Sequence, residues 1–515
     1  MTSNLFYLKG KFFYFMIEWN NLMNKKIKTA LISVFNKDGL EQIVKLLDDK
    51  NIKIISTGGT ADFIKGLNIP VTTVEKITNF PSVFGGRVKT LQPQIFGGIL
   101  NRRDNISDKE EKEKYKIEDI DLVIVDLYPF EETLASGAID EEIIEKIDIG
   151  GISLIRAGAK NFNDVVIVPS KNEYTYITEI LTRGTETTIE ERKYLAGCAF
   201  QVTSQYDSAI REYFEGNKLR YGENPHQSGM FIGNISDSWE QLHGKEMSYN
   251  NFLDTEAAIN LVYDFTEPAF AIIKHMNACG FAIDQNISIA FQKAYDGDPV
   301  SAFGGILASN KPITKEIAEK IRDIKLFVEV IIAPDFEKEA YEILEQKKDI
   351  RILKWKTPTL PKKQSRTCLT GILVQDRDTK VETENDLRCV TKREPTKDEK
   401  NDMLIASVIV KHLKSNSVAI VKNAQLLTMG CGQTSRIDAL KQSLEKAKNF
   451  GFDVHGAVVA SEAFLPFNDC VEVAGNAGIK AVIQPGGSKG DQSSIDKCDE
   501  LDMSMVFTGI RHFKH

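Results

Sequence analysis

The sequence predicts an α/β protein built from doubly wound units. Short apolar runs typical of buried strands recur along the chain, for example at residues 29–34 and 122–125. Turns rich in glycine and hydroxyl side chains follow these runs, and segments with the apolar spacing of helices follow the turns. The 515 residues correspond to about three units, at a prior of ~150 residues per domain.

The amino-acid composition argues against several classes of protein and kinds of binding site. The chain is 42% hydrophobic and 27% charged, so it can form a substantial core. A net charge of -8 without a long basic run argues against nucleic-acid binding, although single loops can still bind phosphate. The seven cysteines form no Cys-x-x-Cys pair, which predicts free thiols and a cytoplasmic protein. None of the seven histidines lies before residue 226, so we expect no typical zinc site in the front half.

Residues 1–25 differ from the rest of the chain. Residues 12–17 are a run of six apolar side chains, whereas a membrane span needs ~20. No small-residue cleavage site follows, so a signal peptide is not expected either. We interpret residues 1–25 as an extension outside the fold, or as sequence upstream of a start at Met16 or Met23.

The front half begins with a β-α-β pattern. Residues 29–34 and 51–55 read as strands, and residues 39–47 between them have helical spacing. The motif Ser-Thr-Gly-Gly-Thr at residues 56–60 then precedes a helix starting at Ala61. Backbone N–H groups, hydroxyls and the helix dipole would form an anion pocket here. A tight turn with an N-cap is the alternative, and the motif is neither a Walker A loop nor a dinucleotide fingerprint.

Ionisable side chains recur at later loops of the front half. Arg87 and Lys89 alternate after two glycines, so in an extended chain both would point to one side; a charged surface turn is the alternative. Asp126 and Tyr128 end a strongly apolar strand, and Asp148 precedes a glycine turn. The sequence also predicts a helix at 153–161 that ends near Lys160, a strand at 165–168 and mostly helix at 173–215.

In the back half, a strand at residues 269–273 ends on two adjacent ionisable residues, Lys274 and His275, after which we expect Asn277 and Gly280 to turn the chain. Histidine can accept a proton near neutral pH, so this is a candidate catalytic base; two solvated polar residues at a strand end are the alternative.

Further elements complete the back half. The polar loop at 218–227 is a candidate binding loop or an interdomain linker. A strand is predicted at 306–308, a charged stretch spans 335–365, and a second αβ cycle follows with a helix at 402–414 and strands at 419–422, 426–429, 457–460 and 481–484. The glycines at 430 and 432 precede a helix but lack the third glycine of a dinucleotide site. The aromatic and basic tail, 507–515, is expected to be docked.

Unaided, these patterns indicate two α/β units with anion sites, and a Lys-His pair in the second. They favour group-transfer or proton-transfer chemistry on phosphorylated substrates, but the substrate cannot be derived from them.

The chain from about Lys25 to its end resembles the family of bifunctional purine biosynthesis proteins, which join 5-aminoimidazole-4-carboxamide ribonucleotide (AICAR) formyltransferase to inosine monophosphate (IMP) cyclohydrolase. Ordered matches across both halves carry the resemblance; they lie at residues 56–60, 86–91, 127–130, 147–151, 159–161, 219–227, 274–275, 297–305, 415–417, 467–469, 483–487 and 511–515.

The resemblance implies the fold of each half. The front unit, residues 26–216, would be the cyclohydrolase, a methylglyoxal-synthase-like doubly wound domain. The back unit, residues 217–515, would be the formyltransferase, built from two cytidine-deaminase-like α/β subdomains without the zinc, in keeping with the absence of a His/Cys zinc signature.

The resemblance also implies residue roles in the formyltransferase. His275 would be the general base, Lys274 would assist proton transfer, and Asn416 would hold the formyl oxygen. The remaining implied residues would bind AICAR or folate; they are Arg220, Tyr221, Asn251, Phe303, Gly304, Phe467, Asp469 and Arg511.

In the cyclohydrolase, the resemblance implies two groups of residues. Those that would carry proton transfer and oxyanion stabilisation are Lys89, Tyr128, Asp148 and Lys160. Those that would bind the nucleotide are Thr57, Gly58, Gly59, Arg87 and Thr90. The chain departs from the common family pattern at Phe35, Gln92, Phe96 and Asp126. We therefore expect an active unit with an altered affinity for its substrate, because the four implied catalytic groups are intact.

The implied co-substrate is 10-formyltetrahydrofolate. The resemblance implies no catalytic metal, leaves room for a structural monovalent cation, and implies a homodimer with small-molecule substrates and neither nucleic-acid nor membrane partners. Two other classes stay open: the front unit as a regulatory phosphate-binding module, and the chain as a non-catalytic folate or nucleotide binder. The retained Lys89, Tyr128, Asp148 and Lys160 argue against the first, and the retained Lys274 and His275 against the second.

Overall fold

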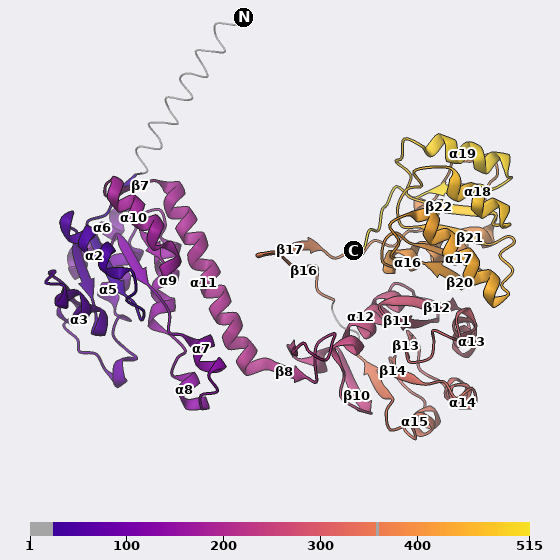
Figure 1. The fold of residues 1–515 in the computed structure, drawn as a ribbon, viewed down its shortest axis with the longest axis horizontal. Helices are drawn as coiled ribbons and strands as arrows, with labels where there is room; N and C mark the ends of the chain where they lie inside the picture. Colours follow the sequence, from indigo (N-terminus) through magenta and orange to yellow (C-terminus); the bar gives the residue numbers. More distant parts are fainter. Residues whose placement is uncertain (1–23, 357–359) are drawn as a thin grey trace, which may run out of the picture. The chain divides into compact units, whose positions relative to one another are not determined.

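The computed structural model describes residues 24–356 and 360–515, which divide into two compact units. The first unit ends at Glu215 and the second starts at Gly216. The elements of each unit can be followed by colour in Figure 1, from indigo to magenta in the first and from magenta to yellow in the second. The predicted extension lies outside the described residues except for its last two.

The first unit contains a five-stranded parallel sheet in the order β4-β3-β2-β5-β6. Its strands are β2 (Thr29–Ser33), β3 (Lys53–Ser56), β4 (Thr72–Thr73), β5 (Leu122–Val125) and β6 (Val166–Val168). From β2 the chain adds strands on one side through β3 and β4, and on the other side through β5 and β6. The predicted doubly wound fold is therefore confirmed, with its topological switch point between β2 and β5.

Helices surround this sheet. The predicted helix after β2 is α2, where Leu40, Ile43, Val44 and Leu47 form one buried stripe. Helices α9 and α11 pack together and cover β6. The helices of this unit are α2 (Leu40–Asp49), α3 (Gly58–Gly66), α4 (Val74–Thr78), α5 (Pro93–Leu100), α6 (Ile106–Tyr115), α7 (Phe130–Ala135), α8 (Asp140–Ile144), α9 (Gly150–Lys160), α10 (Tyr174–Arg183) and α11 (Ile189–Glu215).

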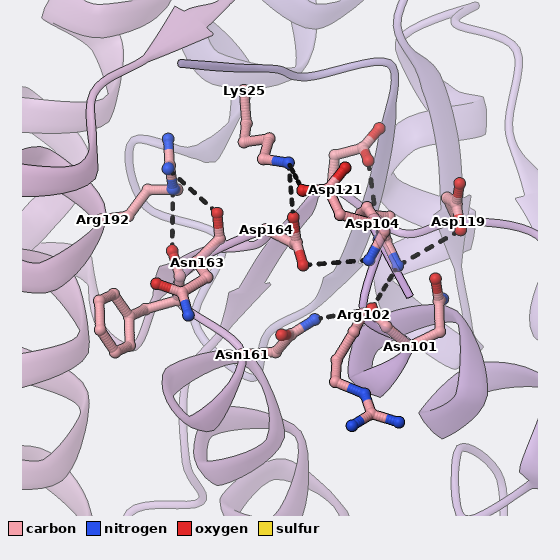
Figure 2. Close-up of polar contacts among 12 residues, drawn as sticks. Lys25, Asn101, Arg102, Asp104, Asp119, Asp121, Asn161, Asn163, Asp164 and Arg192 are labelled. Carbon is pink, nitrogen blue, oxygen red and sulfur yellow. Dashed lines mark hydrogen bonds and ion pairs between the residues drawn. The ribbon is translucent and has the colours of Figure 1, made fainter. Parts of the chain in front are cut away.

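A polar network ties the start of the described chain to the first unit (Figure 2). Strand β1 (Lys25–Lys26) pairs with β7 (Glu186–Thr187), and the Lys25 ammonium lies 2.8 Å from the Asp164 carboxylate. The fully buried Arg192 of α11 donates to the backbone carbonyls of Phe162 and Asn163 at 2.8 and 3.0 Å. Lys25, the last residue of the predicted extension, therefore pairs with residues of the first unit.

The second unit is an internal repeat built on one twelve-stranded sheet. In the first repeat, β11 pairs antiparallel with β12 and β13, β13 to β15 run parallel, and β10 closes the edge antiparallel to β15. The elements are β10 (Trp239–His243), α12 (Tyr249–Tyr263), β11 (Ala269–Lys274), β12 (Asn277–Ile283), α13 (Ile287–Gly297), β13 (Gly305–Ser309), α14 (Lys315–Asp323), β14 (Val328–Ala333), α15 (Lys338–Leu344) and β15 (Arg351–Trp355).

The second repeat follows the same plan. Strand β19 pairs antiparallel with β20 and β21, β21 to β23 run parallel, and β18 closes the edge antiparallel to β23. The elements are β18 (Arg388–Cys389), α16 (Lys397–His412), β19 (Val418–Lys422), β20 (Gln425–Gly430), α17 (Arg436–Phe450), β21 (Val458–Ser461), α18 (Asp469–Asn476), β22 (Ala481–Gln484), α19 (Asp491–Glu500) and β23 (Ser504–Phe507). The two repeats join through β12 and β20, which confirms the predicted pair of α/β subdomains.

The sheet of the second unit has helices on both faces. Helices α12 and α16 pack on one face, on β11 and β19 respectively, and also contact each other. Helices α13 and α17 pack on β12 and β20. Two hairpins complete the unit: β8 (Gly216–Leu219) with β9 (Gly229–Ile232), and β16 (Lys363–Cys368) with β17 (Gly371–Asp376).

Two details of the second unit differ from the sequence prediction. The chain reverses at His275 and Met276, whereas Asn277 and Gly280 lie in β12, so the turn predicted at Asn277 and Gly280 is wrong. Gly280 is needed for packing, because a Cβ there would lie 2.0 Å from the carbonyl oxygen of Ala294. The charged stretch at 335–365 contains α15 and β15, because apolar residues between its charges, such as Leu344 and Ile352, are buried in the core.

The C-terminal tail is docked, as predicted. His512 is buried, with Nδ1 2.6 Å from the Asp378 carboxylate and Nε2 2.8 Å from that of Glu382. Ser415 and Lys514 exchange hydrogen bonds, from Ser415 N to Lys514 O at 2.9 Å and from Lys514 N to Ser415 Oγ at 3.1 Å. Burial alone would lower the pKa of His512, but its two carboxylate partners raise it to about 9.

We expect the free energy of unfolding to fall as pH rises through about 9, because His512 loses its proton there. Because the pKa of His512 is raised in the folded state, its stabilisation is complete below the unfolded-state pKa of about 6.5. This contribution, at most about 3 kcal/mol, is lost above the folded-state pKa of about 9. Urea titrations at pH 6, 8 and 10 measure this loss. His512→Gln, which has no such proton, should lack the His512 part of the decline; equal pH dependence in both proteins would contradict the prediction.

No helix within residues 24–356 and 360–515 is both long and apolar enough to cross a membrane.

Candidate active sites

The first candidate site is a cavity of about 740 Å³ at the switch point of the first unit. Loops from the carboxyl ends of β2, β3 and β5 form its walls, as expected for a doubly wound sheet. The lining residues are 33–35, 37, 57–60, 85–91, 126, 128, 144–145 and 147–151.

Two helix N-termini face this cavity. Helix α3 begins at Gly58, directly after Thr57, and α9 begins at Gly150, beside the buried Thr90. The Thr57 hydroxyl donates to Glu75 at 3.0 Å, and no side chain caps α3. Helix N-termini present unpaired N–H groups and a positive dipole end, so the cavity is suited to a phosphorylated ligand.

Lys89 reaches the first of these helix ends. Its Nζ would lie 3.5 Å from a Cβ at Gly58 and 2.8 Å from one at Gly86. Both glycines have positive φ, 51° and 97°, so the glycines serve the turn and also leave space for the amine. Lys89 therefore brings a cation between the anion-binding loop and the rest of the cavity.

Asp148 and Tyr128 supply further ionisable groups to the lining of this cavity. Asp148 is buried and accepts a 2.6 Å hydrogen bond from Gly151 N, while its own N–H donates to Tyr206 at 2.8 Å. Burial raises the pKa of Asp148, and the nearby charge of Asp126 adds to the increase. Burial also raises the pKa of Tyr128, as do the charges of Asp148, Glu145 and Asp126. Perturbed groups that meet in a cavity are candidates for proton transfer.

The structure does not bring every predicted residue of the first unit to this point. Arg87 lines the cavity, but its exposed guanidinium is paired with Glu145. Lys160 lies at the C-terminal end of α9 and is not part of the lining. At a rise of 1.5 Å per residue it is about 15 Å along the helix from Gly150.

Asp126 and Phe35, two of the departures from the family pattern, shape the loop after β2. The Asp126 carboxylate accepts hydrogen bonds from the N–H groups of Phe35 and Asn36, and Phe35 packs edge-on against Tyr128 at 5.7 Å between ring centroids. Asp126 therefore fixes a loop that contacts a candidate catalytic side chain.

We expect Asp126→Asn to keep the unit active and to move the acidic limb of its pH–rate profile to lower pH. Removing the charge of Asp126 lowers the pKa of Asp148, because that charge is one cause of the increase. The loss of one acceptor should also cost about 1 kcal/mol of stability. Turnover of the first unit as a function of pH tests the shift, with the exposed Asp49→Asn as a control. An unchanged acidic limb would contradict the coupling.

The second candidate site lies at the turn between β11 and β12. Lys274 Nζ donates to Phe303 O at 2.6 Å, and the His275 side chain is exposed. Asn277 Nδ2 donates to His275 O at 2.8 Å, and its Oδ1 accepts from Lys414 N at 3.3 Å. The turn therefore meets the segment that leads to Asn416.

Asn416 is held by buried charged groups. Arg436 donates to Asn416 Oδ1 at 2.8 Å and to the fully buried Glu462 carboxylate at 2.8 Å. Glu462 also accepts from Ser417 N at 3.1 Å. Asn416 Nδ2 donates to Thr434 O at 3.1 Å, and an amide nitrogen has a second hydrogen to offer.

The other predicted residues of the second unit occupy several places. Gly304 is beside Lys274, since its Cβ would lie 3.9 Å from the amine. Arg220 and Tyr221 stack on each other in the loop between β8 and β9, which contacts the start of α12 through Asn250 and Glu223. Asn251 is buried in the capping box of α12.

Three more predicted residues belong to the second repeat or the tail. Arg511 stacks on Phe513 at 4.3 Å, Phe467 is exposed, and Asp469 begins α18. A separate cavity of about 700 Å³, lined by aromatic residues such as Phe231, contains none of the predicted residues.

Sequence reasoning missed Arg436, Glu462 and Asp254, the last of which accepts hydrogen bonds from His275 N and Met276 N. Their partners are distant in sequence, and no spacing pattern indicates them. Among the described residues, no group of three or more His, Cys, Asp or Glu side chains is arranged to hold a metal ion.

Two α/β units, one with an anion cavity and one with a Lys-His turn, are suited to group-transfer and proton-transfer chemistry at two sites. The family model described as "AICARFT/IMPCHase bienzyme" matches residues 158–446, and the model described as "MGS-like domain" matches residues 39–153. The chain belongs to the AICARFT/IMPCHase bienzyme family, which confirms the resemblance found in the sequence.

Curated relatives agree over the full length. The chain is 54% identical to the bifunctional purine biosynthesis protein PurH of Bacteroides thetaiotaomicron, over 96% of this chain and 99% of the relative. It is 46% identical to the PurH of Aquifex aeolicus, over 94% of this chain and all of the relative. A solved structure described as "Crystal structure of ForH" matches with a TM-score of 0.32 and 30% identity, over 36% of this chain and 96% of that one.

Proposed function

We propose that this protein catalyses the last two steps of IMP synthesis: formyl transfer to AICAR, followed by ring closure of formyl-AICAR to IMP. The observation that carries the proposal is the full-length match to bifunctional purine biosynthesis proteins at 54% identity. We assign ring closure to residues 26–216 and formyl transfer to residues 217–515.

In formyl transfer, the amine of AICAR attacks the formyl carbon of 10-formyltetrahydrofolate, and the bond from that carbon to the folate nitrogen breaks. His275 takes the proton that the amine loses, and Lys274 helps deliver a proton to the leaving nitrogen. The free N–H of the Asn416 amide stabilises the formyl oxygen as negative charge develops on it. The contact between Asn277 and Lys414 supports this assignment, because it brings the two segments together.

In ring closure, the carboxamide nitrogen of formyl-AICAR attacks the formyl carbon and water leaves. Lys89, Tyr128 and Asp148 move protons and stabilise the oxyanion, and the N-termini of α3 and α9 hold the phosphate. The shared cavity supports these roles. Lys160 keeps only the family resemblance as support.

We also propose, from the resemblance, the residues that bind substrate. In the first unit the nucleotide is bound by Thr57, Gly58, Gly59, Arg87 and Thr90. In the second unit AICAR or folate is bound by Arg220, Tyr221, Asn251, Phe303, Gly304, Phe467, Asp469 and Arg511. From the same resemblance we propose a homodimer, a cytoplasmic location, independence from a catalytic metal and a structural monovalent cation.

Purified protein with AICAR and 10-formyltetrahydrofolate tests the proposal when tetrahydrofolate and IMP are followed separately. Both products should appear. Tetrahydrofolate with accumulating formyl-AICAR would show that the first unit lacks ring-closure activity. The absence of both products would overturn the proposed formyl transfer.

A further inference from the structure

The repeat in the second unit produces two equivalent turns. Between β11 and β12 the two turn residues are His275 and Met276, with φ of 52° and 64°. Between β19 and β20 they are Asn423 and Ala424, with φ of 55° and 57°. Both hairpins therefore use two consecutive left-handed residues, and neither places a glycine there.

One carboxylate holds each turn. Asp254 of α12 accepts hydrogen bonds from His275 N at 3.3 Å and Met276 N at 2.6 Å. Asp402 of α16 accepts from Asn423 N at 2.9 Å and Ala424 N at 2.7 Å. Both carboxylates are mostly shielded from solvent, and burial raises the pKa of each.

The carboxylates offset a conformational cost. Left-handed backbone is unfavourable for residues with a Cβ, and methionine has no side-chain group that stabilises it locally. Each carboxylate satisfies both N–H groups that point into the turn, which favours this conformation over the alternatives.

The two turns differ in what they carry. The first presents His275, whose backbone is held on both sides, by Asp254 at the N–H and by Asn277 at the carbonyl. The second presents Asn423 at the matching position and has no imidazole. The same backbone device therefore presents an imidazole in only one repeat.

We propose that Asp254 is a positioning residue for formyl transfer, which fixes the turn so that the His275 imidazole is aimed at the substrate amine. The inference rests on the proposed function, because it requires His275 to be the base. Asp254 acts through the backbone of His275 and takes no part in the chemistry itself.

The matched variants Asp254→Asn and Asp402→Asn test this role. Each keeps the shape of the side chain but removes one of the two acceptors. We expect comparable decreases in Tm, because the two networks are equivalent. Since an error of about 1 Å in catalytic geometry can cost about 100-fold, we expect kcat for formyl transfer to fall by about 100-fold in Asp254→Asn, with KM for AICAR changed by less than about threefold. Asp402→Asn should keep kcat within about twofold of the wild type. That change is far smaller than the ~100-fold loss expected when a catalytic group is mispositioned.

A rescue separates positioning from chemistry. Glycine adopts the left-handed conformation without strain, so Met276→Gly added to Asp254→Asn should restore at least about a tenth of wild-type kcat. Met276→Gly alone serves as the control for the rescue. Failure of the rescue, with the double variant folded by circular dichroism, would mean that Asp254 acts other than through the turn.

Two further outcomes are decisive. Equal kcat in Asp254→Asn and the wild type would overturn the positioning role while leaving the proposed function in place. Absence of formyl transfer in the wild type would overturn the proposed function itself. Ring closure of supplied formyl-AICAR, measured in every variant, reports the first unit, and circular dichroism of every variant reports whether the second unit is folded.

Discussion

Replacing His275 with alanine is expected to lower kcat for formyl transfer by about 10²–10⁴-fold, the usual contribution of a general base. The imidazole is exposed at the end of β11, while the backbone around it is held by Asp254 and Asn277, so removing the ring should remove the base without disturbing the turn. Stopped-flow or steady-state formation of tetrahydrofolate measures the loss.

The control for this variant is His455→Ala, which removes an exposed imidazole from the second repeat. It should leave both activities unchanged. AICAR binding to His275→Ala, followed by calorimetry, should be retained, because the proposed role of the ring is proton transfer. Retained turnover would exclude His275 as the base, and lost binding would assign it to substrate recognition instead.

Much of the fold could be predicted because its strands are short apolar runs that end in turn residues. The apolar run before Asp126 indicates a buried strand, and the apolar spacing of Leu40, Ile43, Val44 and Leu47 indicates a helix. The internal repeat could not be predicted in this way. Its turns read Lys-His-Met-Asn and Lys-Asn-Ala-Gln, which share only the lysine, and the equivalence of Asp254 and Asp402 is visible only in the folded structure.

The candidate sites were predicted unevenly for a similar reason. Lys89, Tyr128 and Asp148 follow separate elements, and the doubly wound topology brings the ends of those elements together. Asp254 and Glu462 act on residues far along the chain, so only the folded structure indicates them. Gly280 was misread because a glycine in a strand can serve packing as well as a turn.

Replacing Asp148 with asparagine is expected to lower ring closure by about 10²–10³-fold, within the range of a proton-transfer group. Asparagine can still accept the hydrogen bond from Gly151 N, so α9 should keep its start, but it cannot take up or release a proton near neutral pH. The raised pKa of Asp148 brings its titration closer to neutrality, which favours it for this work.

The two activities make this prediction specific. Formyl transfer belongs to the other unit in our proposal, so Asp148→Asn should form tetrahydrofolate at the wild-type rate while formyl-AICAR accumulates. Asp62→Asn, an exposed change on α3, should alter neither rate. If ring closure survives in Asp148→Asn, then Lys89 and Tyr128 suffice for the proton transfers, and the buried carboxylate serves only to begin α9.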